Sequence, residues 1–481
     1  MDLLIAHHHL AAGGVMRVVA NHLMALDAAT DRPLRVGLLY DGDDSGLPDL
    51  SLTNVAVSRH PVEGIGYADR GDADALVRAV ETLPGAPLHV HNHTLGKNPA
   101  WTAAVRRLAD AGRAMLLQLH DFAEDSRPAN YRRLAGGIGD LGATLYPHSP
   151  RVHLAVLNGR DAGVLSAAGV PADRLHELPN PVPPPPPPAD RGAARGKLHD
   201  LYGVGPDAAY WLCPVRGIRR KNVGELCLMA AAGLATTAIT LAPENPAERP
   251  FYDHWVSVAG ELNLPCRFGV GEGLAFAENL AAADRVVTCS VAEGFGMAFL
   301  EPWAAGRPLG GRDLPAITAD FKAEGLDLSS LTPRVDVPAE WFGAGDYIER
   351  LHAAANLQAA AYGRPAVTRA EVEDSYERRL RDGCLDFGDL DEELQTRVIR
   401  RVASDADAAE LLASRWPADD VPVEANAAVV RDAYGLEATG RRLLSVYDEI
   451  AGADAAPVDA ADAGRVLAEF QSIDGLRLIR S

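Results

Sequence analysis

Two glutamates stand eight positions apart in the segment SVAEGFGMAFLEPW, with a glycine-rich turn between them. Glu293 and Glu301 frame Gly294, Phe295 and Gly296, and the apolar run RVVTC precedes them. A tight glycine turn that opens a helix presents backbone N–H groups, which suit a phosphate. Carboxylates accept hydrogen bonds from sugar hydroxyls. This spacing is therefore typical of a site for a phosphate joined to a sugar.

A basic segment, VRGIRRKN, follows the apolar run YWLC earlier in the same half of the chain. Arg216 and Lys221 lie five residues apart after this predicted strand, where positive side chains suit an anionic ligand. Together with Arg219 and Arg220 they could instead form a solvated basic turn, because runs of charge usually face water. Both interpretations are open from the sequence.

Polar residues also follow the predicted strands of the first half of the chain. Strand-end histidines and glycines in open α/β sheets commonly meet sugars and phosphates. His89, His91 and His93 alternate, so on a strand they would share one face, an arrangement that could also bind zinc. Lys97 could recognise a carboxylate or phosphate of a substrate, or simply face water. The candidate residues of this half are Gly13, Gly14, His91, His93, Lys97 and His120.

These residues need a scaffold that brings strand ends together. Short β-rich runs alternate with helical patterns, which predicts a doubly wound parallel sheet in each half of the chain. In the first half, strands are predicted at 3–7, 35–42, 87–93 and 115–121, with an apolar helix stripe at 14–28. In the second half, strands at 210–216, 237–243, 266–270 and 285–291 alternate with helices near 222–234, 251–263 and 274–283.

Six consecutive prolines at 183–188 mark the boundary between the two sheets, because such a run favours stiff, extended polyproline II. We predict an N-terminal Rossmann-like domain at 1–182, a Pro-rich linker at 183–194 and a C-terminal Rossmann-like domain at 195–425. The second domain should contain a helical insertion from about residue 320. Closing helices and a tail should follow at 426–481. If the two rims of polar strand ends face one another, they enclose a cleft.

Composition limits the function classes. The chain has 481 residues and a net charge of −20, so no overall field attracts nucleic acid or anionic lipid. Its five cysteines form no C-x-x-C pair or disulfide framework, which favours a reducing cytoplasm. No signal peptide or transmembrane segment is predicted. A homo-oligomer is compatible with the sequence.

Five motifs occur in an order known from one enzyme family: AGGVMRVVANHL, LLQLHD, LPNPV, VRGIRRKN and EGFGMAFLE. The chain thereby resembles retaining glycosyltransferases of the GT-B fold, and in particular glycosyltransferase family four. The segment at 426–450 is similar to the closing helices of that family. Together the motifs extend over roughly three quarters of the chain, and a chance match in this order is improbable.

The resemblance implies a nucleoside-diphosphate sugar as donor, bound mainly by the second domain. Arg216 and Lys221 would hold the diphosphate, and Gly294, Phe295 and Gly296 would offer backbone donors. Glu301 would hold the ribose and Glu293 the transferred sugar. His120 would lie near the reacting carbon, and the turn at Gly13 and Gly14 would meet acceptor or phosphate.

The implied reaction transfers a hexose to an acceptor hydroxyl with retention at the anomeric carbon, without metal or cofactor. A nucleotide-sugar hydrolase or epimerase, or an idle sugar-nucleotide binding subunit, are the alternatives. Two features depart from the family pattern. Pro302 follows Glu301 directly, so the helix there should be kinked or begin late. The segment from about 320 to 425 is longer than such a domain needs, and a lid, an acceptor shelf or an oligomer contact would explain it.

Overall fold

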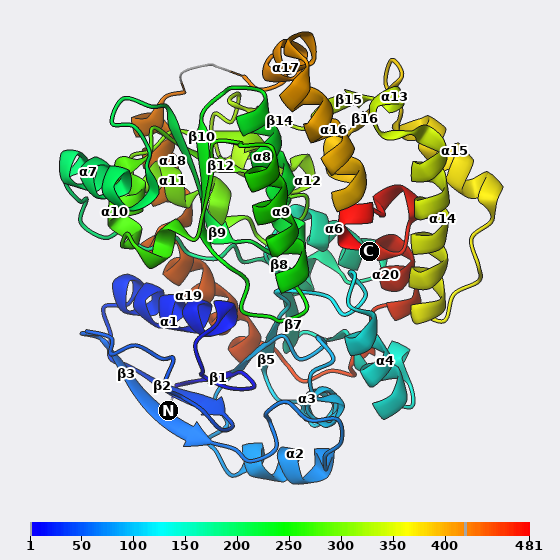
Figure 1. Ribbon diagram of the computed structural model, residues 1–481. Coiled ribbons are helices and arrows are strands. Elements are labelled where there is room, and N and C mark those ends of the chain that lie inside the picture. The colour runs from blue at the N-terminus through cyan, green and yellow to red at the C-terminus, as the bar shows by residue number, and fades with distance from the viewer. Residues whose placement is uncertain (1, 418–420) are drawn as a thin grey trace. The chain divides into compact units, whose positions relative to one another are not determined.

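A computed structural model describes residues 2–417 and 421–481 (Figure 1). The chain forms two compact units. The first contains Met1–Pro183, Ala360–Arg364 and Arg431–Ser472, and the second contains Pro184–Ala359, Pro365–Val430 and Ile473–Ser481. The change of unit between Pro183 and Pro184 falls inside the run of six prolines, which belongs to no helix or strand.

The first unit is built on a seven-stranded parallel sheet. Alternate residues of its strands reach two cores: Leu3 and Ile5 point to one face, Leu4 and Ala6 to the other. Burial on both faces explains why these strands are short, continuous apolar runs. In spatial order the strands are β3 (Val55–Pro61), β2 (Leu34–Tyr40), β1 (Leu3–Ala6), β4 (Leu88–His91), β5 (Met115–Gln118), β7 (Val152–Val156) and β8 (Leu175–Glu177).

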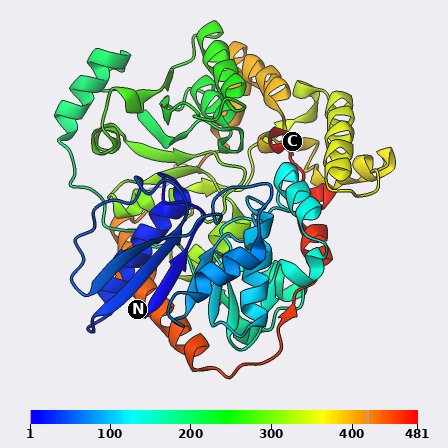
Figure 2. The same cartoon turned by 90° about the horizontal axis from the view of Figure 1, so that it is seen from below.

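Helices cover both faces of this sheet. On one face α1 (Gly14–Ala29) packs along α19 (Leu436–Gly452), which returns from the C-terminal part of the chain; Figure 2 shows the two beside the blue strands. Local sequence sets the helix starts, as at α3 (Pro99–Asp110), where the Asn98 side chain caps the first turn and Pro99 fits it. The remaining elements are α2 (Ala73–Glu81), α4 (Pro128–Gly137), α5 (Leu141–Thr144), α6 (Gly159–Ala167), α20 (Ala463–Phe470) and the small pair β6 (Pro147–His148) and β17 (Asp459–Ala460).

The second unit repeats the architecture with a six-stranded parallel sheet. Its order is β11 (Cys266–Phe268), β10 (Thr236–Leu241), β9 (Tyr210–Arg216), β12 (Arg285–Thr288), β13 (Leu309–Arg312) and β14 (Leu331–Thr332). Its helices are α7 (Arg191–Tyr202), α8 (Val223–Ala231), α9 (Arg249–Glu261), α10 (Phe276–Ala282), α11 (Glu301–Ala304) and α12 (Pro315–Ala323). The predicted α/β class with two Rossmann-like sheets is confirmed.

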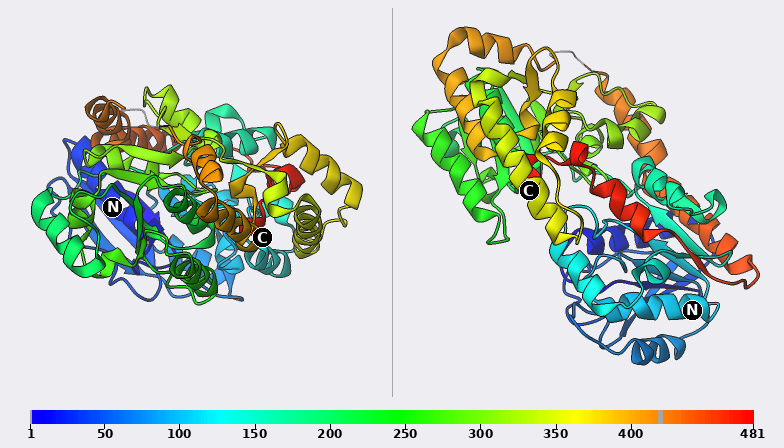
Figure 3. Two further views of the ribbon diagram at one scale, coloured as in Figure 1. Left: turned by 45° about the horizontal axis from the view of Figure 1, so that its top comes forward. Right: turned by 90° about the vertical axis from the view of Figure 1, so that its right-hand side faces the viewer.

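The predicted insertion is mostly helical. Figure 3 shows two of its helices, α14 (Ala344–Ala361) and α15 (Arg369–Arg379), as a yellow hairpin, tied by the bond from Arg379 to the Tyr347 hydroxyl at 3.0 Å. The other elements are α13 (Ala339–Phe342), α16 (Glu392–Ser404), α17 (Ala406–Ala413) and the two-stranded ribbon of β15 (Asp336–Pro338) and β16 (Cys384–Asp386). Helix α18 (Val423–Tyr434) follows, mostly within the predicted closing helices.

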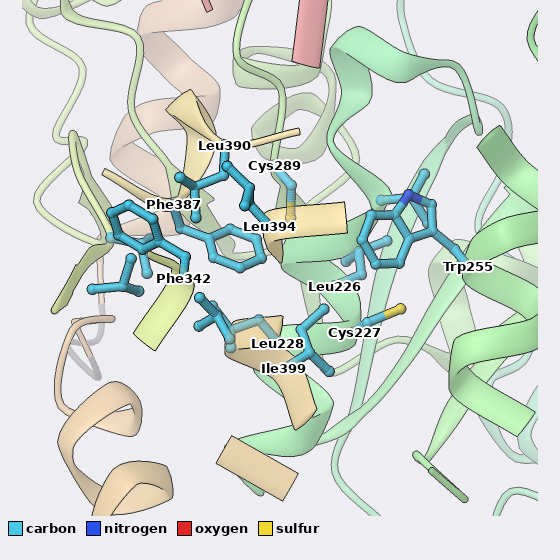
Figure 4. Close-up of a cluster of buried hydrophobic side chains, with 14 of the residues drawn as sticks. Leu226, Cys227, Leu228, Trp255, Cys289, Phe342, Phe387, Leu390, Leu394 and Ile399 are labelled. Atoms are coloured by element: carbon cyan, nitrogen blue, oxygen red, sulfur yellow. The ribbon is translucent and has the colours of Figure 1, made fainter. Parts of the chain in front are cut away.

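Part of the insertion belongs to the core of the second unit. Phe387, Leu390 and Leu394 pack against Leu226 of α8 in one buried cluster (Figure 4). A buried ion network reinforces this contact, because Arg312 of β13 bonds Glu225 of α8 at 2.6 Å and Asp386 of β16 at 2.8 Å. Residues 384–402 therefore complete this unit's core, a role that the sequence does not reveal. Within the described residues, no helix has the length and apolar character needed to span a bilayer.

Candidate active site

The basic segment and the double-glutamate segment of the second unit follow neighbouring strands. β9 and β12 pair in parallel, with Trp211 opposite Arg285, so the loops after their carboxyl ends lie side by side. The backbone N–H of Val291 donates to the carbonyl of Arg220 at 2.9 Å, which joins the two loops directly. Strand topology therefore brings together residues that are seventy positions apart in the sequence.

Glu293 is the centre of a charged cluster in these loops. Its carboxylate bonds the Lys221 ammonium and, at 2.7 Å, the Arg220 guanidinium. Burial is the largest influence on its pKa and raises it, but Lys221 and Arg220 outweigh burial and lower the pKa to about 2. Glu293 is therefore ionised at neutral pH, and its two cations are held in fixed positions. A cation pair oriented by one carboxylate is suited to a ligand with two negative groups.

Arg216 lies outside this cluster. Its guanidinium bonds Glu244 at 2.7 Å, and both side chains are exposed. The second cation at Glu293 is Arg220, which the motif did not assign. The interpretation as a solvated turn is wrong for Arg219, which pairs with Glu392 of α16 at 2.7 Å, whereas the side chains of Arg216 and Arg220 are 44% and 41% exposed. The RR pair before Lys221 was the only signal that could have indicated Arg220.

The glycine turn between the two glutamates is tightly shaped. Gly296 has a φ of +96°, and a Cβ atom there would lie 2.8 Å from the Phe299 ring, so only glycine fits. The Phe295 side chain is buried against Phe321. Its backbone, rather than its ring, is therefore the part that can contact a nucleotide-sugar donor. Helix α11 begins at Glu301 and has four residues, with Pro302 in its first turn. The predicted late helix start is confirmed.

Histidines of the first unit form a buried hydrogen-bonded pair at adjacent strand ends. His91 ends β4, and its Nδ1 atom lies 2.8 Å from Nε2 of His120, two residues beyond β5. Asn92, in the left-handed region at φ +54°, accepts from the backbone N–H of His120 at 2.7 Å and fixes that loop. The outer nitrogens of the pair, Nε2 of His91 and Nδ1 of His120, are buried and have no hydrogen-bond partner among the residues that the structure describes.

Burial makes these histidines neutral. It lowers the pKa of His120 to about 3 and holds that of His91 well below its usual value. The row continues to His89, which lies 2.7 Å from the Tyr447 hydroxyl and 3.0 Å from Gln118 Oε1. A neutral imidazole can both donate and accept, so the row suits hydroxyl groups better than anions. Asn92 and Tyr447 are polar members that the motifs did not indicate.

The other first-unit candidates occupy different surroundings. His93 lies beyond the end of β4 and is buried 3.0 Å from the carbonyl of Leu145, so it does not join His89 and His91 as the zinc interpretation requires. The Lys97 ammonium stacks on the Tyr67 ring at 5.2 Å from its centroid. Helix α1 begins at Gly14 as predicted, and a Cβ atom there would meet nothing within 4 Å. Space therefore remains for a ligand at this helix N-terminus.

Comparisons with known proteins bear on the fold and on the similarity to glycosyltransferases. No known family profile matches the chain. Over 320 residues it is 30% identical to the mannosylglucosyl-3-phosphoglycerate synthase of Petrotoga mobilis, covering 62% of this chain and 62% of that enzyme. The chain thus aligns with somewhat under two thirds of that relative's length.

Solved structures match over nearly the whole chain. Sucrose-phosphate synthase from Thermosynechococcus elongatus superposes with a TM-score of 0.54 at 14% identity, over 94% of this chain and all of that one. The catalytic domain of Arabidopsis thaliana starch synthase IV gives 0.52 at 13%, over 94% and 99%. Anabaena HepE, solved with UDP and glucose, gives 0.51 at 13%, over 93% and 99%. The chain therefore has the GT-B fold of such glycosyltransferases, which confirms the fold and the resemblance that its motifs predict.

Proposed function

We propose that the protein transfers a hexose from a nucleoside-diphosphate sugar to a hydroxyl group of an acceptor. The observation that carries this proposal is the cluster of Lys221, Arg220 and Glu293 beside the glycine turn at Gly296. It places two oriented cations after the carboxyl end of β9 and Glu293 after that of β12, and open α/β sheets bind ligands at such strand ends. The similarity to a glycosyltransferase from Petrotoga mobilis supports the same conclusion.

The negative charge that develops on the leaving diphosphate is the part of the reaction that most needs stabilisation. Lys221 and Arg220 supply positive potential where the negative charge grows, and their fixed positions avoid reorganisation during the reaction. Arg216 joins them by exchanging its exposed bond to Glu244 for the diphosphate. Glu301 holds the ribose. Glu293 orients the two cations and lies next to the transferred sugar.

The acceptor side uses the neutral histidines. His120 offers its Nδ1 atom to a hydroxyl of the transferred sugar or of the acceptor, while His91 fixes the ring from behind. Attack occurs on the same face that the diphosphate leaves, and a phosphate oxygen takes the acceptor proton. The anomeric configuration is thereby retained. Lys221 and the two arginines provide the charge stabilisation, so the transfer needs no metal.

The acceptor carries an anionic group. The name of the similar Petrotoga enzyme includes a phosphoglycerate, which has a phosphate and a carboxylate. Lys97 is the candidate partner for such a group, and its ammonium lies over the Tyr67 ring. Burial has the largest influence on the pKa of Lys97 and lowers it, and the nearby cations Arg133 and Arg127 lower it further. A bound anion would reduce the repulsion between these like charges. The Gly13–Gly14 turn at the start of α1 offers further N–H donors.

A transfer assay tests the proposal. The protein is incubated with UDP-, GDP- and ADP-hexoses and with phosphorylated and neutral acceptors, and release of nucleoside diphosphate is measured with and without acceptor. We expect acceptor-dependent turnover, an unchanged initial rate in EDTA, and an NMR spectrum of the product with the donor's anomeric configuration. Full turnover without acceptor would indicate a hydrolase or epimerase. Donor binding without turnover on any acceptor would indicate a binding subunit.

A further inference from the structure

Three potential metal ligands meet at the edge of the first unit's sheet, apart from the candidate active site. They are His153 on β7, His176 on β8 and Glu449 on α19, and one ligand atom of each lies within 4.8 Å of the others. The geometry points to a binding site for a divalent transition-metal ion of the zinc class, held by these three side chains. Such a site would clamp the C-terminal helix α19 to the two last strands of the sheet.

The fold itself produces this convergence. β7 and β8 pair in parallel with Ala155 opposite His176, and His153 precedes Ala155 by two residues, so both histidines point to the same face. Helix α19 covers that face, because its Leu443 and Tyr447 share a core with Ala155. Glu449 follows Tyr447 on the solvent side of the helix. Three elements that are distant in sequence therefore each contribute one ligand.

The environment of His153 prepares it for a metal. The ring is 2% exposed, and its Nε2 atom lies 3.1 Å from the carbonyl of Pro150. A carbonyl oxygen can only accept, so Nε2 carries the ring proton and Nδ1 presents its lone pair. Metal-bound histidines commonly use the opposite nitrogen in this way, as a donor that fixes the tautomer and the ring orientation. In this protein the lone pair of Nδ1 points to His176.

The two histidine rings must separate and turn before a metal ion fits between their nitrogens, and the Glu449 carboxylate lies within 4.8 Å of both. Nδ1 of His153 and Nε2 of His176 lie 2.8 Å apart in rings inclined by 23°. Zinc bonds of about 2.0–2.2 Å at tetrahedral angles separate two ligand nitrogens by roughly 3.3 Å, so the pair must open by about 0.5 Å. His176 is partly exposed, and its Nε2 proton can pass through solvent to Nδ1 when the metal binds. Glu449 supplies negative charge, while Asp173 adds to it and Arg174 opposes it.

Two imidazoles and one carboxylate define the class of ion. Nitrogen ligands favour zinc, cobalt, nickel and copper over magnesium and calcium, and water completes the coordination. The role is structural. His153 is paired with Leu116 in β5, and His120 lies four residues further along that chain, which is about 13 Å in extended strand. The ion is therefore too far from His120 to contact a substrate bound there, and it takes no part in the proposed transfer.

A second group of three histidines, His22, His89 and His91, fits a metal less well. The rings of His89 and His91 stack with centroids 4.2 Å apart, whereas the rings of His153 and His176, also stacked, lie 5.0 Å apart and meet nitrogen to nitrogen. Both nitrogens of His89 already face Tyr447 and Gln118. A metal would have to break those contacts in a fully buried place. The edge site loses one hydrogen bond, the one between His153 and His176, and His176 is partly exposed to solvent.

The test is zinc binding to the full-length protein. After dialysis against a chelator, the protein is titrated with ZnCl₂ against a competing chromophoric chelator, and with CoCl₂ while its visible spectrum is recorded. We expect one zinc ion per chain, a cobalt spectrum of low coordination number, and a higher Tm in the presence of zinc. Glu449→Gln and His176→Gln should each weaken zinc binding by roughly tenfold or more. Both residues lie at the surface, so the variants should fold.

Asp448→Asn is the matched control, because Asp448 is also an exposed acid on α19 but is not one of the three ligands. Its zinc affinity should stay within about twofold of the wild-type value. Absence of zinc binding by the wild-type protein would overturn the inference. So would an affinity that both Glu449→Gln and His176→Gln leave unchanged. Loss of binding in His22→Ala alone would assign the metal to the buried histidine row instead and would also overturn it.

Discussion

The candidate residues of the two units differ in charge. In the second unit, Glu293 is ionised and pairs with both Lys221 and Arg220. In the first unit, His91 and His120 are buried, have no charged partner in the described part of the chain, and are neutral. Buried charge survives only where it is paired, and unpaired buried groups give up their charge. The second unit is therefore equipped for a diphosphate and the first for hydroxyl groups.

Acid should have the largest effect, and it should act on the first unit. The folded pKa values are lowered by burial to about 3 for His7, His89 and His120 and about 4 for His8 and His93, below the ordinary value near 6.5. The unfolded chain thus binds more protons than the folded one, and stability falls as pH drops through 6.5. Each of these histidines should lower the free energy of unfolding by about 2 kcal/mol between pH 7 and pH 5.

Carboxylates change this picture little. Glu124 and Asp161 act in the opposite direction, since burial raises the pKa of Glu124 to about 7 and that of Asp161 above its ordinary value, but they are two groups against several. In the second unit, the stabilisation from Glu293 is lost only as pH falls below its unfolded value of about 4.5 toward 2. Hydrogen exchange at pD 7 and 5, corrected for intrinsic rates, should show loss of protection mainly in strands β1, β4 and β5. An equal loss of protection in β9 and β12 would show that the two units do not differ in their sensitivity to acid.

Removal of Lys221 should have the next largest effect. Lys221→Ala takes a cation from the diphosphate and leaves the buried Glu293 with Arg220 as its remaining charged partner in the cluster. Charge-assisted hydrogen bonds contribute about 1.5–3 kcal/mol, so kcat/KM should fall by roughly ten- to a hundredfold or more. Lys322→Ala is the control, because Lys322 pairs with Asp313 at 2.6 Å elsewhere in the same unit. Similar kinetics for the two variants would show that the cluster does not bind the donor.

Glu301→Ala should produce a smaller and different change. Ribose hydroxyls are the same before and during transfer, so loss of their partner should raise the donor KM by about tenfold and leave kcat nearly unchanged. Glu293→Ala should lower kcat as well, because Glu293 positions both cations. Steady-state kinetics with one donor separate the two. A lower kcat with unchanged donor affinity in Glu301→Ala would be the wrong pattern for a ribose ligand.

Lys97→Ala should give the smallest change. Loss of one partly exposed cation should raise the KM of an anionic acceptor by about three- to tenfold and leave a neutral acceptor unaffected. Lys197→Ala, which removes a lysine paired with Glu278 in the second unit, serves as the control. An unchanged KM for the phosphorylated acceptor would remove Lys97 from the acceptor site.

The long buried strands could be predicted from the sequence, and the order of the motifs predicted the fold. YWLCPVR became β9 with the same bounds, and the helix predicted at 14–28 is α1. Other strands carry weak signals. β3 is an edge strand with mostly exposed residues, and β8 has three residues. β13 contains Gly310 and Gly311, which suggest a turn, although a Cβ atom at Gly311 would lie 2.2 Å from the Thr288 carbonyl of the neighbouring strand.

The site could be predicted in outline but not in its pairing. Motif spacing located Glu293 and Lys221, yet the choice of Arg220 over Arg216 depends on the turn between them. Gly217 lies in that segment, and its backbone passes so close to the Tyr252 ring that a Cβ atom there would lie 2.3 Å from it. Contacts between distant segments are harder still. Tyr447 lies 358 residues from His89, and no local pattern indicates that its hydroxyl ends the histidine row.

Calorimetric titration with a nucleoside diphosphate tests the central claim most directly. The claim is that the charged cluster of the second unit holds the diphosphate and the neutral histidines of the first unit do not. Wild-type protein, Lys221→Ala and His120→Gln are titrated with the nucleoside diphosphate that the donor panel selects. We expect Kd to rise about ten- to a hundredfold in Lys221→Ala and to stay within about twofold in His120→Gln. An unchanged Kd in Lys221→Ala, or a large loss in His120→Gln alone, would contradict the account.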